Sequence, residues 1–86
     1  MGMSTNPPIQ VVTMYTLPNC EFCEMAKNLL HSRQNCVIYE IDLSKNSKVR
    51  EGVKESLGTT VPQIVIDGNH IGGYEELKSY IKGQQP

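Results

Sequence analysis

Short runs of β-branched and other apolar residues along the chain predict four strands. Hydrophobic and polar positions alternate over part of the second run, as in a strand with one buried face. The third and fourth runs are separated by Asp67-Gly68, a dipeptide typical of a tight hairpin turn. The last two strands are therefore expected to be antiparallel neighbours. The four runs are residues 11–15, 36–42, 63–66 and 69–71.

Apolar residues at helical spacing predict three helices, at residues 21–34, 47–57 and 74–82. Asn19 or Cys20 is placed to cap the first helix, and Gly58 is placed to end the second. The apolar residues that share a face are Phe22, Ala26, Leu29 and Leu30 in the first helix, Val49, Val53 and Leu57 in the second, and Tyr74, Leu77 and Ile81 in the third.

The resulting order, β-α-β-α-β-β-α, predicts an α/β fold. A strand–helix–strand start gives a parallel pair of strands joined by a right-handed crossover. The chain of 86 residues has room for one domain, since domains typically contain roughly 100–150 residues. We expect a flexible leader at residues 1–10, the folded domain at residues 11–83 and a frayed C-terminus at residues 84–86.

Composition and charge exclude several classes of protein. Eight Lys and Arg stand against nine Asp and Glu, a net charge of −1, so no basic excess drives binding to nucleic acid. No apolar run approaches the ~20 residues of a membrane-spanning helix, and residues 1–8 are too polar for a signal peptide. Three cysteines are an odd number and too few for a disulfide-rich secreted scaffold. We therefore expect a cytoplasmic protein with neither a nucleic-acid nor a membrane partner.

The sharpest chemical signal is Cys20-Glu21-Phe22-Cys23, at the start of the first predicted helix. The thiolate is the reactive form of cysteine, and the unpaired N–H groups and the dipole at a helix N-terminus lower the pKa of a sulfur placed there. Cys20 is therefore the candidate nucleophile. Cys23, one helical turn further, is placed to resolve the mixed disulfide that Cys20 would form with a substrate.

Zinc binding and a structurally inert cysteine pair are the alternatives for this motif. A structural zinc ion takes four ligands, and His31, Cys36 and His70 are not spaced as a second pair of ligands would be. The β-α-β context favours redox chemistry over both alternatives. We therefore expect a redox-active pair and no metal site.

Two further segments each admit two interpretations. In Thr60-Val61-Pro62, the proline either opens an edge strand or forms a cis-proline turn against the cysteines, which leaves the Val61 backbone free to pair with an extended substrate. Gly72-Gly73 is either a break between strand and helix or a place where a ligand contacts the backbone. In the second case, N–H groups at the start of the third helix could hold a carboxylate.

Together these segments resemble a glutaredoxin. The resemblance rests on Tyr15-Thr16 before the cysteine motif, on residues 59–63 and on residues 71–77, in the order and spacing of that family. It implies a thioredoxin-like fold, with a four-stranded mixed sheet in the order 2-1-3-4 flanked by three helices. It also implies a glutathione–disulfide oxidoreductase that reduces protein disulfides and glutathione mixed disulfides, with glutathione as co-substrate.

The resemblance also implies roles by position. Cys20 matches the nucleophile and Cys23 the resolving thiol of the family. Within the implied glutathione groove, the Val61 backbone pairs with the cysteinyl unit of glutathione, and residues 73–75 hold its γ-glutamyl end. The residues that match the groove are Phe22, Thr60, Val61, Pro62, Gly73, Tyr74 and Glu75.

Two positions depart from the family pattern. Glu21 stands where most dithiol members have proline, and a carboxylate beside the thiolate should raise the pKa of Cys20. Leu17 stands where many members have a lysine before the motif. Lys48 or Arg50, in the second predicted helix, is the expected replacement for that cation in binding glutathione.

Two other functions stay open. Some family members hold a [2Fe–2S] cluster between two chains with the help of glutathione; the lack of proline after Cys20 favours this, and Cys23 argues against it. Other relatives are reduced directly by thioredoxin reductase, but they carry a tryptophan near the C-terminus and this chain has none. We prefer a monomeric, cytoplasmic reductase of disulfide-bearing proteins, among which the resemblance implies ribonucleotide reductase.

Overall fold

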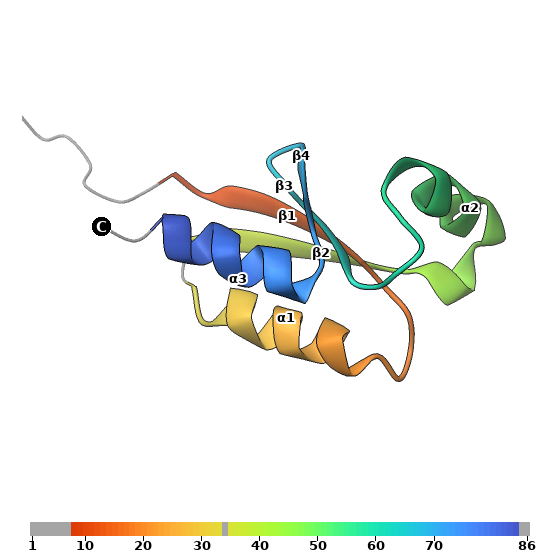
Figure 1. Ribbon diagram of the computed structural model, residues 1–86, viewed down its shortest axis with the longest axis horizontal. Helices are drawn as coiled ribbons and strands as arrows, with labels where there is room; N and C mark the ends of the chain where they lie inside the picture. Colours follow the sequence, from red (N-terminus) through yellow and green to blue (C-terminus); the bar gives the residue numbers. More distant parts are fainter. Residues whose placement is uncertain (1–7, 34, 85–86) are drawn as a thin grey trace, which may run out of the picture.

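The computed structural model describes residues 8–33 and 35–84 (Figure 1). Within them no helix has both the length and the hydrophobicity that crossing a bilayer requires. The strands are β1 (Gln10–Thr16), β2 (Cys36–Asp42), β3 (Gln63–Ile66) and β4 (Asn69–Gly72). The helices are α1 (Glu21–His31), α2 (Ser47–Ser56) and α3 (Tyr74–Gly83), with a short 3₁₀ helix, η1 (Leu43–Lys45), before α2.

The strands form one mixed sheet in the order β2-β1-β3-β4, which confirms the predicted thioredoxin-like topology. β1 and β2 are parallel and end together, with Thr16 opposite Asp42. β3 is antiparallel to both β1 and β4, and its first residue, Gln63, lies opposite Tyr15. This register brings the loop after β1 and the loop before β3 to the same end of the sheet, although they are far apart in the sequence.

The hydrophobic core lies between the sheet and the helices α1 and α3, which lie side by side on one face (Figure 1). Alternate residues of β1 and β3 point into it, because side chains alternate between the two faces of a strand. This packing holds the N-terminus of α1, where the cysteine motif begins, against the end of the sheet. The fully buried members are Val12, Met14, Ala26, Leu30, Ile64, Ile66 and Leu77.

α2 covers the other face of the sheet only in part. Its residues Val49 and Val53 line an open pocket with Tyr15 and Val65, whose side chains point away from the main core. Val53 is buried, but Val49 is 37% exposed. The spacing of apolar residues therefore identifies this helix correctly without showing which of them are buried.

α1 is shorter than its hydrophobic spacing predicts. It ends at His31, and Ser32 closes its last turn with a backbone N–H that bonds back to the helix and a hydroxyl that donates to a carbonyl of that turn at 2.6 Å. Gln34, the predicted end, lies outside the described residues, as do residues 1–7 of the expected leader and residues 85–86 of the expected frayed end. β1 begins within the span expected for the leader.

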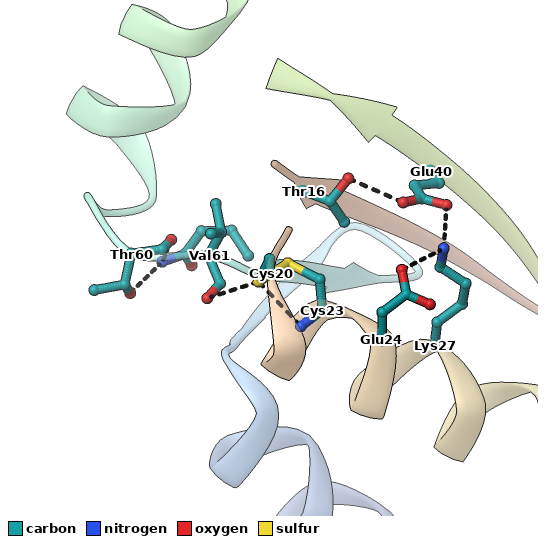
Figure 2. Close-up of a disulfide and its surroundings, with 9 residues drawn as sticks. Thr16, Cys20, Cys23, Glu24, Lys27, Glu40, Thr60 and Val61 are labelled. Atoms are coloured by element: carbon teal, nitrogen blue, oxygen red, sulfur yellow. Dashed lines mark hydrogen bonds and ion pairs between the residues drawn. A yellow bond between two sulfur atoms is a disulfide. The ribbon is translucent and has the colours of Figure 1, made fainter. Parts of the chain in front are cut away.

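An ion pair fastens α1 to β2 (Figure 2). Lys27 Nζ lies 2.9 Å from Glu40 Oε1 and 3.3 Å from Glu24 Oε2. Glu40 Oε2 also accepts a hydrogen bond from the buried Thr16 hydroxyl at 3.0 Å. The hydrogen bond from Lys27 lowers the pKa of Glu40 and, in turn, the bond to Glu40 raises the pKa of Lys27. The network joins α1, β1 and β2 close to the cysteine motif.

Glu40→Gln is expected to lower the free energy of unfolding at pH 7 by about 0.5 to 1 kcal/mol, as for a partly exposed ion pair. Because the pKa of Glu40 is lower in the folded state than in the unfolded state, this stabilisation is present above the unfolded-state pKa. It is lost as the pH falls through the folded-state pKa. Urea unfolding of both proteins at neutral pH and at about pH 3 measures the difference.

The matched control is Glu51→Gln, which removes an exposed ion pair within α2, where Glu51 Oε2 lies 3.6 Å from Lys54 Nζ. We expect this control to change stability less than Glu40→Gln, because it leaves the contacts between elements intact. An equal loss of stability for Glu40→Gln at both pH values would contradict the assignment.

Candidate active site

Cys20 occupies the N-cap position of α1. The chain turns into the helix through Asn19, at a φ of 59°, and Cys20 itself is extended, with φ and ψ of −106° and 107°. Its Sγ accepts a hydrogen bond from the Cys23 N–H at 3.1 Å (Figure 2), where a serine or aspartate oxygen usually caps a helix. A thiolate at this sulfur would be stabilised by the same N–H group and by the helix dipole.

Cys20 and Cys23 are joined in a disulfide, with their Cα atoms 5.2 Å apart. Cys20 is half-buried, whereas Cys23 is only 1% exposed. An open pocket of about 480 Å³ beside Cys20 is also lined by Asn19, Glu21 and Glu24. An incoming sulfur can therefore approach Cys20 but not Cys23, an arrangement compatible with the predicted nucleophile and resolving thiol.

The Val61-Pro62 segment lies against this disulfide. The peptide bond between the two residues is cis, which is the second of the interpretations that the sequence leaves open. The Pro62 side chain is fully buried, and the Val61 carbonyl oxygen lies 3.9 Å from Cys20 Sγ (Figure 2). The Val61 backbone therefore lies beside the reactive sulfur. Its pairing with glutathione stays a prediction.

The start of α3 lies next to Phe22 of α1. The rings of Phe22 and Tyr74 have centroids 6.1 Å apart, and Phe22 is 54% exposed. Gly72 has a φ of 120°, and a Cβ there would lie 3.0 Å from Glu76 Cγ, so the position requires glycine. The Gly73 N–H donates to Glu76 Oε1 at 2.8 Å. The two glycines thus make the turn into α3, and the contact of Gly73 and Tyr74 with glutathione stays a prediction.

The acidic side chains around the site differ in whether they are paired. Glu75, predicted in the groove, lies 3.1 Å from Lys78 Nζ, and Glu24 belongs to the network that joins α1 to β2. Glu21 forms no ion pair within residues 8–33 and 35–84. Glu21 directly follows Cys20 in the sequence. No cation in these residues compensates its negative charge.

Lys48, the expected replacement for the missing cation, is exposed in the first turn of α2. Its backbone N–H donates to the N-cap residue Asn46 at 3.0 Å. Across the described part of the chain, neither Lys48 nor Arg50 has a hydrogen bond or ion pair with the cysteines. Leu17 is half-buried in the loop before them. The role of Lys48 therefore stays a prediction.

Sequence patterns do not single out two polar residues close to the site. Gln63 is buried, and its Nε2 donates to the Thr60 carbonyl at 3.0 Å and to the Thr60 hydroxyl oxygen at 3.3 Å. Its Oε1 lies 2.7 Å from His70 Nε2 in β4. Thr60, predicted as a groove residue, is therefore held by Gln63. The available signal was a polar residue opening a buried strand, with a histidine on the facing strand of the hairpin.

Comparison with known proteins agrees with this geometry. The Glutaredoxin family model matches residues 12–71. Glutaredoxin 3 of Escherichia coli K12 is 43% identical over 67 residues, which cover 77% of this chain and 80% of that protein. A hybrid peroxiredoxin of Haemophilus influenzae is 39% identical over 69 residues, 80% of this chain but 28% of that longer protein. The solution structure of a glutaredoxin from Brucella melitensis superposes with a TM-score of 0.73 at 33% identity, covering 94% of this chain and 87% of the other.

With its cysteine pair at the start of α1, the molecule is a thiol–disulfide oxidoreductase of thioredoxin-like fold. The chain belongs to the glutaredoxin family, since the family model covers most of the folded residues and the relatives match over most of the chain. This confirms the resemblance to the glutaredoxin family that the sequence indicates.

Glu21→Gln is expected to lower the pKa of the Cys20 thiol in the reduced protein. The Glu21 carboxylate directly follows Cys20, and a negative charge there opposes formation of the thiolate. In the Cys23→Ser background, the pH dependence of alkylation by iodoacetamide, followed by mass spectrometry of the peptide that contains Cys20, measures this pKa separately from that of Cys36. Glu55→Gln, an exposed change on α2, is the control, and an unchanged or higher pKa in Glu21→Gln would show that the carboxylate has no such effect.

Proposed function

We propose that this chain is a glutathione-dependent reductase of protein disulfides and of glutathione mixed disulfides. The observation that carries the proposal is the accessible Cys20 sulfur at a helix N-terminus, with the Val61 carbonyl 3.9 Å away. An extended peptide can pair with exposed backbone as an added strand. The cysteinyl unit of glutathione, paired with Val61 in this way, would present its sulfur to Cys20.

The first step is a displacement at sulfur. In the reduced protein, the Cys20 thiolate attacks one sulfur of the substrate disulfide, so that a bond to Cys20 forms as the substrate S–S bond breaks. The leaving thiolate takes a proton from water. The hydrogen bond from the Cys23 N–H to Cys20 Sγ stabilises the negative charge of the Cys20 thiolate before the attack.

The mixed disulfide can then be resolved in two ways. For a protein disulfide, Cys23 loses its proton and attacks Cys20 Sγ, which releases the second substrate thiol and leaves the Cys20–Cys23 disulfide. Two glutathione molecules supply the two electrons that reduce this disulfide and leave as glutathione disulfide. For a glutathione mixed disulfide, Cys20 takes the glutathione sulfur and a second glutathione attacks it directly, so Cys23 is not required.

The other groove residues have roles of support in this proposal. Phe22 and Tyr74, with ring centroids 6.1 Å apart, form an aromatic wall beside Cys20. The N-terminus of α3, at residues 73–75, binds the γ-glutamyl carboxylate, as helix N-termini bind anions. Lys48 would reach the glycine carboxylate. Family resemblance adds a cytoplasmic location, a monomeric state and ribonucleotide reductase as one protein substrate.

The test is NADPH consumption in a mixture of glutathione, glutathione reductase and a small glutathione mixed disulfide. We expect activity in the native chain, loss to background in Cys20→Ser and partial activity in Cys23→Ser, because glutathione itself can resolve the intermediate. Cys36→Ser is the matched control and should keep full activity, since Cys36 Sγ donates to the Leu30 carbonyl at the far end of α1.

Two outcomes would contradict the proposal. Full activity in Cys20→Ser would remove the assigned nucleophile. An inactive native chain that becomes active when thioredoxin reductase replaces glutathione and glutathione reductase would show that glutathione is not the reductant.

A further inference from the structure

The buried side chain of Gln63 has no part in the chemical steps described above. It is 5% exposed, and it lies directly after the cis Val61–Pro62 bond, at the first position of β3. Burying a primary amide costs free energy unless its donors and its acceptor are hydrogen-bonded. The partners of this amide therefore indicate why a polar residue is kept here.

The partners determine how the amide is oriented. The Thr60 carbonyl can only accept, so the Gln63 atom 3.0 Å from it is the donor Nε2, which also donates to Thr60 Oγ1 at 3.3 Å. The remaining atom, Oε1, is an acceptor and lies 2.7 Å from His70 Nε2. His70 must therefore carry a proton on Nε2, which it does both as the neutral Nε2–H tautomer and as the imidazolium. The Gln63 amide therefore has acceptors for its Nε2 group and a donor for its Oε1 atom.

The backbone before β3 is shaped to fit around this amide. Gly58 has a φ of 146°, and a Cβ there would lie 2.9 Å from Gln63 Nε2. The chain that leaves α2 therefore passes directly beside the amide, where glycine is required. Thr60 is held by two hydrogen bonds to Gln63, and the Pro62 side chain is fully buried.

Val61 lies between Thr60 and Pro62, and its carbonyl oxygen is 3.9 Å from Cys20 Sγ. We propose that Gln63, oriented by His70, is a positioning residue that holds the Val61 backbone beside Cys20 for glutathione to bind. This inference rests on the proposed function, because it takes glutathione as the ligand that pairs with Val61. Neither Gln63 nor His70 takes part in the exchange of sulfur bonds.

Gln63→Met tests the role of the amide, because it keeps the length of the side chain and removes its three hydrogen bonds. We expect the KM for a small glutathione mixed disulfide to rise about tenfold, with kcat changed less than about twofold, because binding is weakened equally in the ground and transition states. A merely destabilised fold would lower the active fraction, and hence the apparent kcat, without this rise in KM.

His70→Leu tests the hydrogen bond between His70 and Gln63. His70 is exposed, so folding is less affected than by a change at Gln63. It removes the donor to Gln63 Oε1, and we expect KM to rise about threefold because the amide is left in place but less well oriented. His70→Gln supplies an amide N–H donor and should restore most of the native KM. The matched control is Asn69→Ala, a change at the exposed residue before His70. It should leave KM unchanged.

Alkylation of Cys20 by iodoacetamide in the reduced variants separates the position of the loop from the reactivity of the thiolate. We expect the rate in Gln63→Met to stay within about twofold of the native rate, because the hydrogen bonds that Gln63 makes reach Thr60 and His70 but not Cys20.

The proposal is overturned if the native chain is active and Gln63→Met keeps the native KM. Where Gln63→Met does not fold, an unchanged KM in His70→Leu overturns it in the same way. A native chain without glutathione-dependent activity overturns the proposed function instead, so the two failures are distinguishable.

Discussion

The hydrogen bond from the Cys23 N–H to Cys20 Sγ is the interaction on which the site depends. A helix begins with N–H groups that have no partner within the helix, and here a sulfur atom is one of the partners. The arrangement that caps the start of the helix would therefore also stabilise a thiolate in the reduced protein. It works only if the first turn of α1 is held in place, which the core beneath Ala26 and the ion pair between Lys27 and Glu40 both do.

The rest of the site is largely backbone, and polar side chains behind it keep that backbone in position. Gln63 holds the loop that carries Val61, and Glu76 holds Gly73 at the start of α3. At both places a glycine makes room for the supporting side chain: Gly58 beside Gln63, and Gly72 beside Glu76. A ligand recognised through backbone groups would depend on the position of those groups, and hence on the side chains that support them.

Most of the fold can be predicted from the sequence, because the signals that specify it are local. The Asp67-Gly68 turn, the run of residues at β3 and the helical spacing of the residues in α3 all depend on near neighbours. The cis bond at Pro62 and its position against the cysteines are harder, since they depend on the pairing of β1 with β3. There the family resemblance supplies what periodicity does not.

What the sequence leaves unpredicted depends on register and packing. The hydrogen bond between Gln63 and His70 requires a particular register of β3 with β4. That register shifts between Ile64 and Val65. The exposure of Val49 depends on how α2 packs against the sheet. The i, i+4 spacing of the apolar residues in α2 does not specify this packing. η1 is stabilised by Asp42, whose side chain accepts from the Ser44 N–H and hydroxyl, a contact with no hydrophobic pattern to reveal it.

The most direct test of this account is the pKa of Cys20 in the reduced Cys23→Ser variant, measured from the pH dependence of alkylation of its peptide, with Cys36 in the same molecule as the internal reference. A sulfur that caps α1 should titrate below the ordinary cysteine value of about 8.5 and react faster than Cys36 at neutral pH. A pKa at or above that value would contradict the central claim that the start of α1 stabilises the thiolate.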